Sequence, residues 1–431
     1  MVLENTKTCE DVYKCLEQNK LDAAMSACED MLKNHPENPE ALHLKGVVCY
    51  QQNELENALP YLEKAVQLSP KNPHYLNTLG LLQRNLRMWD AALVTFQIAL
   101  THKPDFGQAQ ANMALVYLDK KEIKNALNCF EKAVPLLPDN PDVLTNYAHT
   151  LRDSGQLADS AKIYHQVLEF EPENERYLLN VGAIEMARKQ EDKARIAYEK
   201  VLLKNPHEPT ASHILAGLKG EHTNQAPDQY VADLFDVYAE EFDYHLASLG
   251  YEVPQMLGAR IPAIMAPRAK VGAWHVLDLG CGTGACGLQF AACKNDMIGV
   301  DLSKKMLKKS AEHNIYDDLF EGSISAYFAS TDKCFDLILA ADVFVYIGNL
   351  ETIFKDIVAH ANKGALFGFS TELAPNTTDF ELRTSGRYGH SDAYISKLAR
   401  AYGFSTLLAK DIIVRKDAQG DLAGKLYVLQ K

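Results

Sequence analysis

The pattern of apolar and polar positions divides this chain of 431 residues into two parts. In the first part, small and aromatic residues recur at an interval of 34 residues, which is the period of a helical hairpin repeat. From about Trp274, short apolar runs each end in a glycine or an acid and are followed by a helical stretch. Strands that alternate with helices favour a parallel, doubly wound sheet. The pattern therefore predicts an all-α solenoid followed by an α/β domain.

Three kinds of position carry the 34-residue interval. In each helical hairpin a proline ends the second helix, and two small residues let the paired helices approach closely. Aromatic side chains such as Phe96 and Phe130 then fill the seams between neighbouring units. The three series are Pro36, Pro70, Pro104, Pro138, Pro172 and Pro206; Gly46, Gly80, Ala114, Ala148, Gly182 and Ala216; and Ala24, Ala58, Ala92, Ala126, Ser160 and Ala194.

These residues resemble the tetratricopeptide repeat family over about residues 5–208, as six units. The first unit fits least well, because Val12 stands where the other units carry glycine or alanine. Residues 210–219 follow the last unit and are expected to form a capping helix. We therefore expect a repeat domain over residues 5–220. The resemblance implies that its concave groove holds a peptide or a protein surface.

The second part ends differently from the way it begins. The runs WHVLDLG, MIGVDLS, FDLILAAD and ALFGFST are each followed by a helical stretch. The later runs FSTLLAKDIIV and GKLYVLQK are separated only by the turn-rich DAQGD, which leaves no room for a helix. This ending predicts an antiparallel hairpin on the sheet.

The loop after the first run reads DLGCGTG from Asp278 to Gly284, and we expect a helix to follow over residues 285–293. Glycines let the backbone approach a ligand, and a helix start offers free N–H groups. Gly282, Gly284 and Gly287 also satisfy the G-x-G-x-x-G fingerprint of dinucleotide sites. A pyrophosphate there would be repelled by Asp278, whereas the sulfonium and ammonium of S-adenosylmethionine would be attracted. Electrostatics therefore favours S-adenosylmethionine.

The order of VLDLGCGTG, IGVDLS and FDLILAADVFVYI resembles the class I S-adenosylmethionine-dependent methyltransferase family over about residues 227–431. The resemblance implies a Rossmann-like, seven-stranded sheet with an antiparallel terminal hairpin, S-adenosyl-L-methionine as cofactor and methyl transfer as activity. We expect a linker and lid helix over residues 221–252 and the methyltransferase domain over residues 253–431. The phrases FDYHLASLGYEVP and GRYGHSDAYI are similar to a bacterial subgroup in which repeats precede this domain.

The resemblance also implies which residues bind the cofactor. The glycines of the loop line its methionine end, and Asp278 helps to hold its ammonium. Asp301 takes both ribose hydroxyls, unless it caps the next helix, a task that Ser303 can perform instead. Asp342 faces the cofactor or the acceptor, unless it only caps a helix. The implied positions are Asp278, Gly280, Cys281, Gly282, Gly284, Asp301, Leu302, Ser323, Ile324 and Asp342, with Ser323 and Ile324 near the adenine.

The segment before the sheet carries apolar residues at helical spacing, among them Leu234 and Phe235. These residues either pack on the edge of the sheet or form a lid over the cofactor. In family members such a leading helix is often a lid, which would bring Tyr230, Tyr238 or Phe242 near the cofactor.

Methyl transfer is an in-line displacement, so the enzyme must align the acceptor, exclude water and supply a base when the acceptor is protonated. His390, in GRYGHS, and His245, in the lid segment, are the candidate bases. For each histidine the alternative is a purely structural role. Tyr346 and Tyr388 are candidates to line the acceptor pocket.

The methyl acceptor is not identified by the sequence. A protein recruited by the repeats is the leading hypothesis, with a small molecule or a non-catalytic scaffold as alternatives. Asn112, Asn146 and Asn180 occupy the same place in three successive repeats. Each amide either binds a peptide backbone in the groove or bonds to a neighbouring helix.

Charge and composition exclude several classes of protein. A net charge of −13 argues against direct binding to nucleic acid, which requires a basic surface. No stretch approaches the roughly 20 apolar residues of a membrane span, and the start MVLENTKTCEDV lacks the apolar run of a signal peptide. The nine cysteines lack the spacing of a zinc site, so we expect reduced thiols and no metal. These features predict a cytoplasmic protein.

Overall fold

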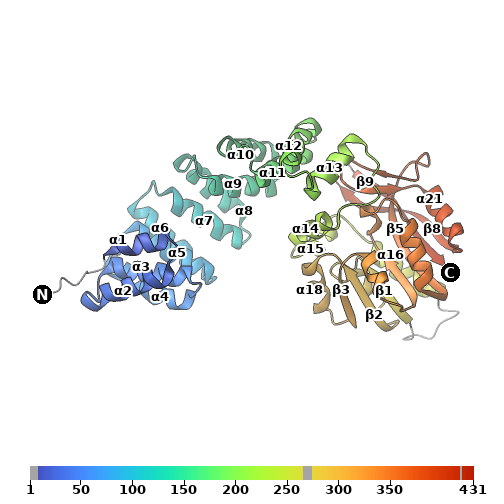
Figure 1. Ribbon diagram of the computed structural model, residues 1–431, viewed down its shortest axis with the longest axis horizontal. Coiled ribbons are helices and arrows are strands. Elements are labelled where there is room, and N and C mark those ends of the chain that lie inside the picture. The colour runs from blue at the N-terminus through green and yellow to red at the C-terminus, as the bar shows by residue number, and fades with distance from the viewer. Residues whose placement is uncertain (1–7, 266–273, 418–419) are drawn as a thin grey trace. The chain divides into compact units, whose positions relative to one another are not determined.

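The computed structural model describes residues 8–265, 274–417 and 420–431 (Figure 1). The chain divides into two compact units, Met1–Ala194 and Arg195–Lys431, and each is described by itself. The first seven residues and the centre of the predicted turn DAQGD lie outside the described residues.

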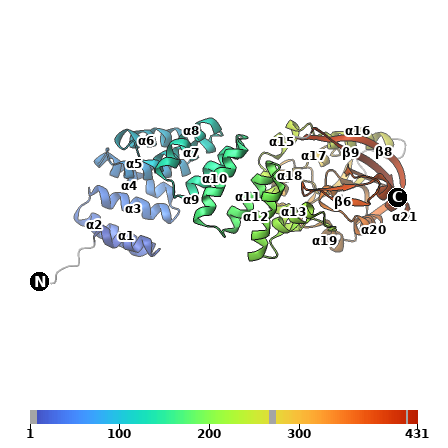
Figure 2. The same ribbon diagram turned by 90° about the horizontal axis from the view of Figure 1, so that it is seen from above.

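Paired helices form the first unit, as the 34-residue interval predicted (Figure 2). Each repeated proline lies two residues after the end of a helix, such as Pro36 after Asn34 and Pro70 after Leu68. The elements are α1 Cys9–Glu17, α2 Leu21–Asn34, α3 Pro39–Gln51, α4 Leu55–Leu68, α5 Pro73–Asn85, α6 Trp89–His102, α7 Gly107–Asp119, α8 Ile123–Ala133, the short 3-10 turn η1 Val134–Leu136, α9 Pro141–Asp153, α10 Leu157–Phe170 and α11 Glu175–Ala187, and α12 Glu191–Lys204 crosses the boundary.

The small residues stand where the helices of a pair touch. A Cβ atom added to Gly46 would lie 2.5 Å from the side chain of Leu62, and one added to Gly80 would lie 2.6 Å from Phe96. A larger residue at either glycine would push the paired helices apart. This contact explains why glycine or alanine occupies that place from Gly46 onward.

A fourth series, which keeps to the same interval, escaped the sequence analysis. Asn38, Asn72, Asn140 and Asn174 are the N-caps of α3, α5, α9 and α11, and their side chains accept backbone N–H groups of the first turn. Capping by asparagine satisfies donors that a helix start leaves free. Each cap fixes where the first helix of a repeat begins.

The second unit holds the strands and the remaining helices. The helices are α13 Pro209–Lys219, α14 Asp228–Tyr238, α15 Phe242–Ser248, α16 Val253–Met265, α17 Ala285–Leu288, α18 Lys304–Glu312, α19 Ile324–Ala329, the 3-10 turn η2 Phe344–Tyr346, α20 Glu351–His360 and α21 Asp392–Ala401. The strands are β1 Trp274–Leu279, β2 Lys294–Asp301, β3 Asp318–Glu321, β4 Phe335–Ala340, β5 Ala361–Leu373, β6 Phe380–Leu382, β7 Tyr388–His390, β8 Ser405–Asp417 and β9 Gly420–Gln430.

The sheet confirms the predicted fold and adds one hairpin to it. Strands β3, β2, β1, β4 and β5 are parallel neighbours in that order, β9 pairs antiparallel with β5, and β8 pairs antiparallel with β9. These are the seven expected strands with the terminal hairpin. The additional hairpin β6–β7 pairs with the end of β5 at Glu372 and Leu373. This hairpin pairs with β5 past the end of β4, because the last residue of β4 that pairs with β5 lies opposite Phe369.

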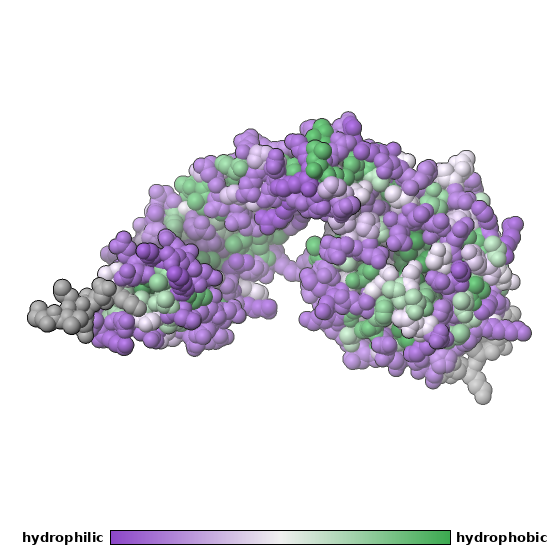
Figure 3. Space-filling view, in the orientation of Figure 1, coloured by the Kyte–Doolittle hydropathy of each residue, from purple (hydrophilic) through white to green (hydrophobic). Residues whose placement is uncertain are grey.

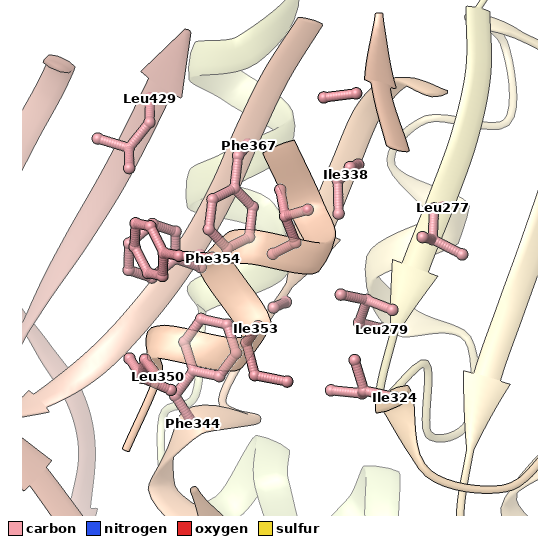
Figure 4. Packing of buried hydrophobic residues seen from close by; sticks show 14 of the residues in the cluster. Leu277, Leu279, Ile324, Ile338, Phe344, Leu350, Ile353, Phe354, Phe367 and Leu429 are labelled. Carbon is pink, nitrogen blue, oxygen red and sulfur yellow. The ribbon is translucent and has the colours of Figure 1, made fainter. Parts of the chain in front are cut away.

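Helices cover both faces of this sheet. Residues of α19, α20 and α21 pack on one face, where Phe354 and Phe367 stack edge to face within the cluster shown in Figure 4. Helix α16 covers the other face through Val253, Leu257 and Ile261. Two apolar layers around a mostly parallel sheet leave the loops at the strand ends free to bind a ligand.

The helix expected over residues 285–293 is shorter than predicted. Helix α17 ends at Leu288, and the backbone then turns through hydrogen bonds between residues three apart, such as Phe290 to Gly287. Since β2 begins at Lys294 and Phe290 is buried under the sheet, the connection is too short for a longer helix.

The exposed faces are mostly polar. Figure 3 shows hydrophilic residues over most of the visible face of each unit, with hydrophobic residues in small groups. Within the described ranges, no helix is long and apolar enough to cross a membrane.

Candidate functional site

The loop after β1 is built from glycines in the left-handed conformation. Gly280, Gly282 and Gly284 have φ angles of 62°, 54° and 94°, which residues with a side chain rarely adopt. A Cβ atom on Gly280 would lie 2.5 Å from Val343. The nearest atom to a Cβ on Gly282 would be 3.9 Å away, so the backbone there is open to a ligand.

A cavity of about 490 Å³ opens beside this loop, at the carboxyl ends of the parallel strands. Its volume lies in the range of small-molecule sites, which is about 300 to 1,000 Å³. The predicted residues that it brings together are Gly280, Cys281, Gly282, Asp301, Leu302, Ser323, Ile324, Asp342, Tyr346 and His245. The predicted residues Asp278, Gly284 and His390 are not among those that line it.

Asp278 lies beneath the glycine loop rather than in the cavity wall. Its side chain is buried, and Oδ2 accepts a 2.7 Å hydrogen bond from the hydroxyl of Tyr316. Its Oδ1 is buried without a hydrogen-bond partner in the structure. Burial raises the pKa of Asp278 to about 7, because the charged form loses its hydration.

Asp301 ties the end of β2 to the glycine loop. Its Oδ2 accepts from the backbone N–H of Gly282 at 2.9 Å, and its Oδ1 accepts from that of Ser303 at 2.8 Å. The helix that follows is capped by Ser303, whose hydroxyl accepts from Met306. Burial raises the pKa of Asp301. Ser303, and not Asp301, is therefore the cap of α18. The carboxylate of Asp301 lines the cavity.

At β3 the cavity meets the start of α19. Ser323 is the N-cap of that helix, and its hydroxyl accepts from the backbone N–H of Ala326. Ile324 lies next to it in the cavity wall. This strand end thus presents a hydroxyl that caps a helix and an apolar side chain to the cavity.

Asp342 follows β4 in a left-handed conformation, with φ of 56°. The 3-10 turn after it has Val343 at its N-cap and no side-chain cap, so Asp342 is not a helix cap. Its Oδ2 instead lies 3.7 Å from a nitrogen of Arg387 and 3.5 Å from one of Arg415. Burial raises the pKa of Asp342.

Arg387 and Arg415 line the cavity, and the sequence analysis missed both. Arg387 donates a 2.9 Å hydrogen bond to the hydroxyl of Tyr346. It belongs to the phrase GRYGHS, in which only the histidine and the tyrosine were considered. Arg415 comes from β8, where no local pattern in the sequence separates it from an exposed strand residue.

The two candidate histidines lie in different surroundings. His390 is buried in β7, its Nε2 is 2.9 Å and 3.0 Å from the carbonyls of Ile347 and Gly348, and burial lowers its pKa to about 4. Two carbonyl neighbours require Nε2 to donate, so the ring is held as a neutral core residue. His245 is exposed and lines the cavity from α15, stacked on Tyr238. The structure therefore favours the structural alternative for His390.

Tyr388, the other candidate for the acceptor pocket, is fully buried beside His390. Its hydroxyl is bonded to that of Thr223 at 2.5 Å. It does not line the cavity.

Helices α14 and α15 cover the cavity. Tyr230, Phe235, Tyr238 and Phe242 all line it, and Phe235 packs edge to face on Tyr346. The segment thus lines the cavity and also packs on the turn after β4.

Acidic residues fasten these two helices to the sheet loops. Asp243 accepts from the hydroxyl of Thr283 in the glycine loop at 2.5 Å, and Asp236 accepts from Ser303. Glu240 pairs with Lys309 of α18 at 2.9 Å. Ser303 at the start of α18 and Lys309 within it therefore hold the segment of α14 and α15 in place.

The repeated asparagines differ from one another. Asn112 is buried, and its amide donates a 2.9 Å hydrogen bond to Asn77, as the interhelical alternative expected. Asn146 and Asn180 are half-buried.

Within the part of the chain that the structure describes, no group of three or more histidine, cysteine or acidic residues could hold a metal ion. All nine cysteines have free thiols.

Sequence comparison identifies both parts of the chain. Residues 276–364 match the methyltransferase domain family. Residues 16–73 and 147–209 match the tetratricopeptide repeat family, and residues 108–174 match YpiA-like C-terminal tetratricopeptide repeats. The chain therefore combines tetratricopeptide repeats with a methyltransferase domain, which confirms the predicted architecture.

Two curated relatives are methyltransferases. A release factor glutamine methyltransferase of Agrobacterium fabrum is 31% identical over 120 residues, which are 27% of this chain and 42% of that protein. A botryococcene C-methyltransferase of Botryococcus braunii is 27% identical over 134 residues, 29% of this chain and 34% of that protein. The chain thus spans less than half the length of these relatives.

Among solved structures, pilF of Pseudomonas aeruginosa aligns with a TM-score of 0.43 at 20% identity, over 48% of this chain and 95% of pilF. YrrB, described as a repeat protein with an unusual peptide-binding site, aligns with a TM-score of 0.38 at 21% identity, over 44% of this chain and 98% of YrrB.

Proposed function

We propose that this chain, in which tetratricopeptide repeats precede a methyltransferase domain, transfers a methyl group from S-adenosylmethionine to an acceptor recruited by the repeats. The observation that carries the proposal is the arrangement of Asp301 and the glycine loop around one cavity. A carboxylate at the end of β2 suits two ribose hydroxyls, and an open glycine backbone suits the amino-acid end of the cofactor.

The residues present fit this cofactor. The Oδ1 of Asp278 is buried without a partner, which is costly unless a donor or a cation approaches it. An ammonium group beside the glycine loop would meet that need, whereas the pyrophosphate of a dinucleotide would not. Asp301 has two backbone donors but lies in the cavity wall, so it can accept further hydrogen bonds.

The bound cofactor supplies a methyl group on a sulfonium, which is already a good leaving group. The protein must therefore hold the acceptor in line and keep water out. Tyr238 and Phe242 cover the cavity from the lid helices, and Tyr346 forms its wall after β4. We propose these residues as the walls that exclude water.

For acceptors that lose a proton, the cavity offers His245 and Tyr346 as groups that can contact the acceptor. Burial raises the pKa of Tyr346, so its hydroxyl stays protonated near neutral pH and can donate or accept a hydrogen bond. His390 has no path to the cavity through its bonded Nε2. We propose His245 and Tyr346, rather than His390, as the contacts of the acceptor.

We further propose that residues 5–220 recruit the acceptor or a protein that brings it, that residues 221–252 form the linker and lid, and that residues 253–431 carry the chemistry. Tetratricopeptide repeats generally bind peptides or proteins, which supports recruitment. The named acceptors of the two relatives are a release factor glutamine and botryococcene. Because one of these acceptors is a protein and the other a small molecule, the alternative is a small-molecule acceptor, with the repeats used for assembly.

Calorimetry with S-adenosylhomocysteine tests the cofactor assignment. Asp301→Ala should weaken binding by about 1.5 to 3 kcal/mol, the range for losing hydrogen bonds to a charged group. Asp332→Ala, which removes an exposed carboxylate on a loop away from the cavity, is the matched control and should bind like the parent. Equal affinity of the Asp301 variant and the parent would remove Asp301 from the site. No binding by the folded parent would favour a non-catalytic scaffold.

A further inference from the structure

The end of the cavity away from Asp301 is built from two arginines on elements that the cofactor loop does not use. Arg387 follows the turn of the β6–β7 hairpin, and Arg415 lies on β8. Both line the cavity. The side chains of Arg387 and Arg415 are 22% and 12% exposed, so both guanidinium groups are largely removed from water, which is costly unless each is paired.

Glu372 holds these arginines from beneath. It lies in β5, and its side chain is only 2% exposed. Its Oε1 accepts from Arg415 at 2.8 Å and from Arg387 at 3.2 Å, while its Oε2 accepts from Arg383 at 2.8 Å. One buried carboxylate thus orients three guanidinium groups. Arg383 also reaches the half-exposed Glu381, at 3.3 Å.

The pairing leaves one positive charge over before Asp342 is counted. Three guanidinium groups face the carboxylates of Glu372 and Glu381 at hydrogen-bond distance. Asp342 lies 3.7 Å from Arg387 and 3.5 Å from Arg415, within ion-pair distance, so that three guanidinium groups face three carboxylates once it is counted. Burial raises the pKa of Asp342, and the positive charges of Arg387 and Arg415 oppose that shift.

The arginines lie beyond the place expected for the reacting methyl group. In the sheet order β2, β1, β4, β5, neighbouring strands are about 4.8 Å apart. Asp301 ends β2 and the glycine loop follows β1, so the ribose and methionine parts of a cofactor would occupy that side. Glu372 and the arginines that it holds are two strands further on, past β4.

We propose that Arg387 and Arg415 form a subsite that binds a carboxylate of the methyl acceptor. This inference rests on the proposed function and specifies the chemical class of its substrate. One buried glutamate fixes both guanidinium groups, and each is a planar fork of N–H donors, the geometry that recognises a carboxylate by paired hydrogen bonds. Asp228 also lines the cavity and adds negative charge, so a ligand with a single charge fits better than a doubly charged phosphate.

The test uses full-length protein saturated with S-adenosylhomocysteine. Acetate, succinate and benzoate are titrated at constant ionic strength, with acetamide, succinamide and benzamide as uncharged matches and inorganic phosphate as a competing anion. The thermal midpoint is followed for the parent, Arg387→Gln, Arg415→Gln and Arg387→Lys. Arg400→Gln, at an exposed position on α21, is the control.

We expect at least one carboxylate to raise the midpoint saturably, while its amide does not. Each glutamine variant should weaken that binding about tenfold or more, the usual effect of losing a charged hydrogen bond. Arg387→Lys keeps the charge but not the paired geometry, so it should bind between the parent and Arg387→Gln. The proposal is overturned if carboxylates act like their amides, if only phosphate binds, or if the glutamine variants bind like Arg400→Gln.

A second arm excludes the carboxylate of the cofactor as the ligand. The affinities of S-adenosylhomocysteine and of methylthioadenosine, which lacks the amino-acid carboxylate, are compared in the parent and the glutamine variants. If the variants lose affinity only for S-adenosylhomocysteine, the arginines bind the cofactor and the acceptor assignment is wrong. If the parent binds neither compound, the proposed function fails. Unchanged cofactor affinity together with lost carboxylate binding supports the subsite.

Discussion

Asp278 is a buried carboxylic acid whose two oxygens have different surroundings. One accepts from Tyr316 and the other has no partner. Burial raises its pKa to about 7, from an ordinary value of 3.8. Between these two values the native state holds a proton that the unfolded chain has released. The protein without cofactor should therefore lose stability from this group as the pH rises from about 4 to about 7.

This linkage predicts a pH-dependent cofactor affinity. If the ionised form of Asp278 attracts the ammonium group of the cofactor from beneath the glycine loop, as proposed, the affinity for S-adenosylhomocysteine should rise with pH until about 7 and then level off. Asp278→Asn should bind more weakly and should flatten both the affinity profile and the stability profile. Calorimetry and thermal unfolding between pH 5.5 and 8 measure both. A parent affinity that does not change with pH, or a variant that binds more tightly, contradicts this role.

At the residue scale, the meeting of Asp301 and the glycine loop at one cavity was predictable, and the presence of two arginines in the same cavity was not. Asp301 and the glycine loop each follow a strand that its apolar run predicts. Because the carboxyl ends of parallel strands meet at one edge of a doubly wound sheet, the two were expected to lie together. Arg387 and Arg415 reach the cavity only because a hairpin and a late strand fold back toward β5. Their meeting depends on long-range pairing, which no local pattern expresses.

At the element scale, α13 is joined to the hairpin that carries Arg387. His213 donates from Nε2 to the carbonyl of Gly386 at 2.8 Å, and burial lowers the pKa of this histidine. A Cβ atom on Gly217 would lie 2.6 Å from the carbonyl oxygen of Arg383, so the helix packs directly on the turn. The helix expected to cap the repeats thus also supports the turn before Arg387.

His213→Ala should loosen this turn. It leaves a buried carbonyl without a donor, which costs about 1 to 3 kcal/mol. We expect a lower free energy of unfolding and weaker binding at the arginine subsite, with cofactor affinity nearly unchanged. His207→Ala, at an exposed position just before α13, is the control for denaturant unfolding. An unchanged unfolding free energy for His213→Ala would show that the contact contributes nothing.

The elements also show where local pattern ends. The seven main strands and the repeat helices have periodic apolar positions and were expected. Strands β6 and β7 have three residues each, too few to reveal a period of two. Helix α17 was overestimated, because its sequence does not record how soon β2 must begin.

At the scale of the whole molecule, we expect the two parts to have separable tasks, and the repeated asparagines offer a matched set of variants. Asn112→Ala leaves the buried Asn77 without its partner and should cost about 1 to 3 kcal/mol of stability. Asn146 and Asn180 are half-buried, so changing both to alanine should leave the melting temperature and cofactor affinity nearly unchanged. If these two amides hold a peptide in the groove, the double variant should lose only recruitment.

Transfer of a labelled methyl group from S-adenosylmethionine into a lysate of the source cell, separated into protein and small-molecule fractions, tests the central claim most directly. The account predicts that the parent labels the protein fraction, that the Asn146 and Asn180 double variant labels it much less, and that Asp301→Ala labels neither fraction. Label in the small-molecule fraction alone would contradict recruitment of a protein acceptor. Label that stays with S-adenosylmethionine in the presence of the folded parent would contradict methyl transfer itself.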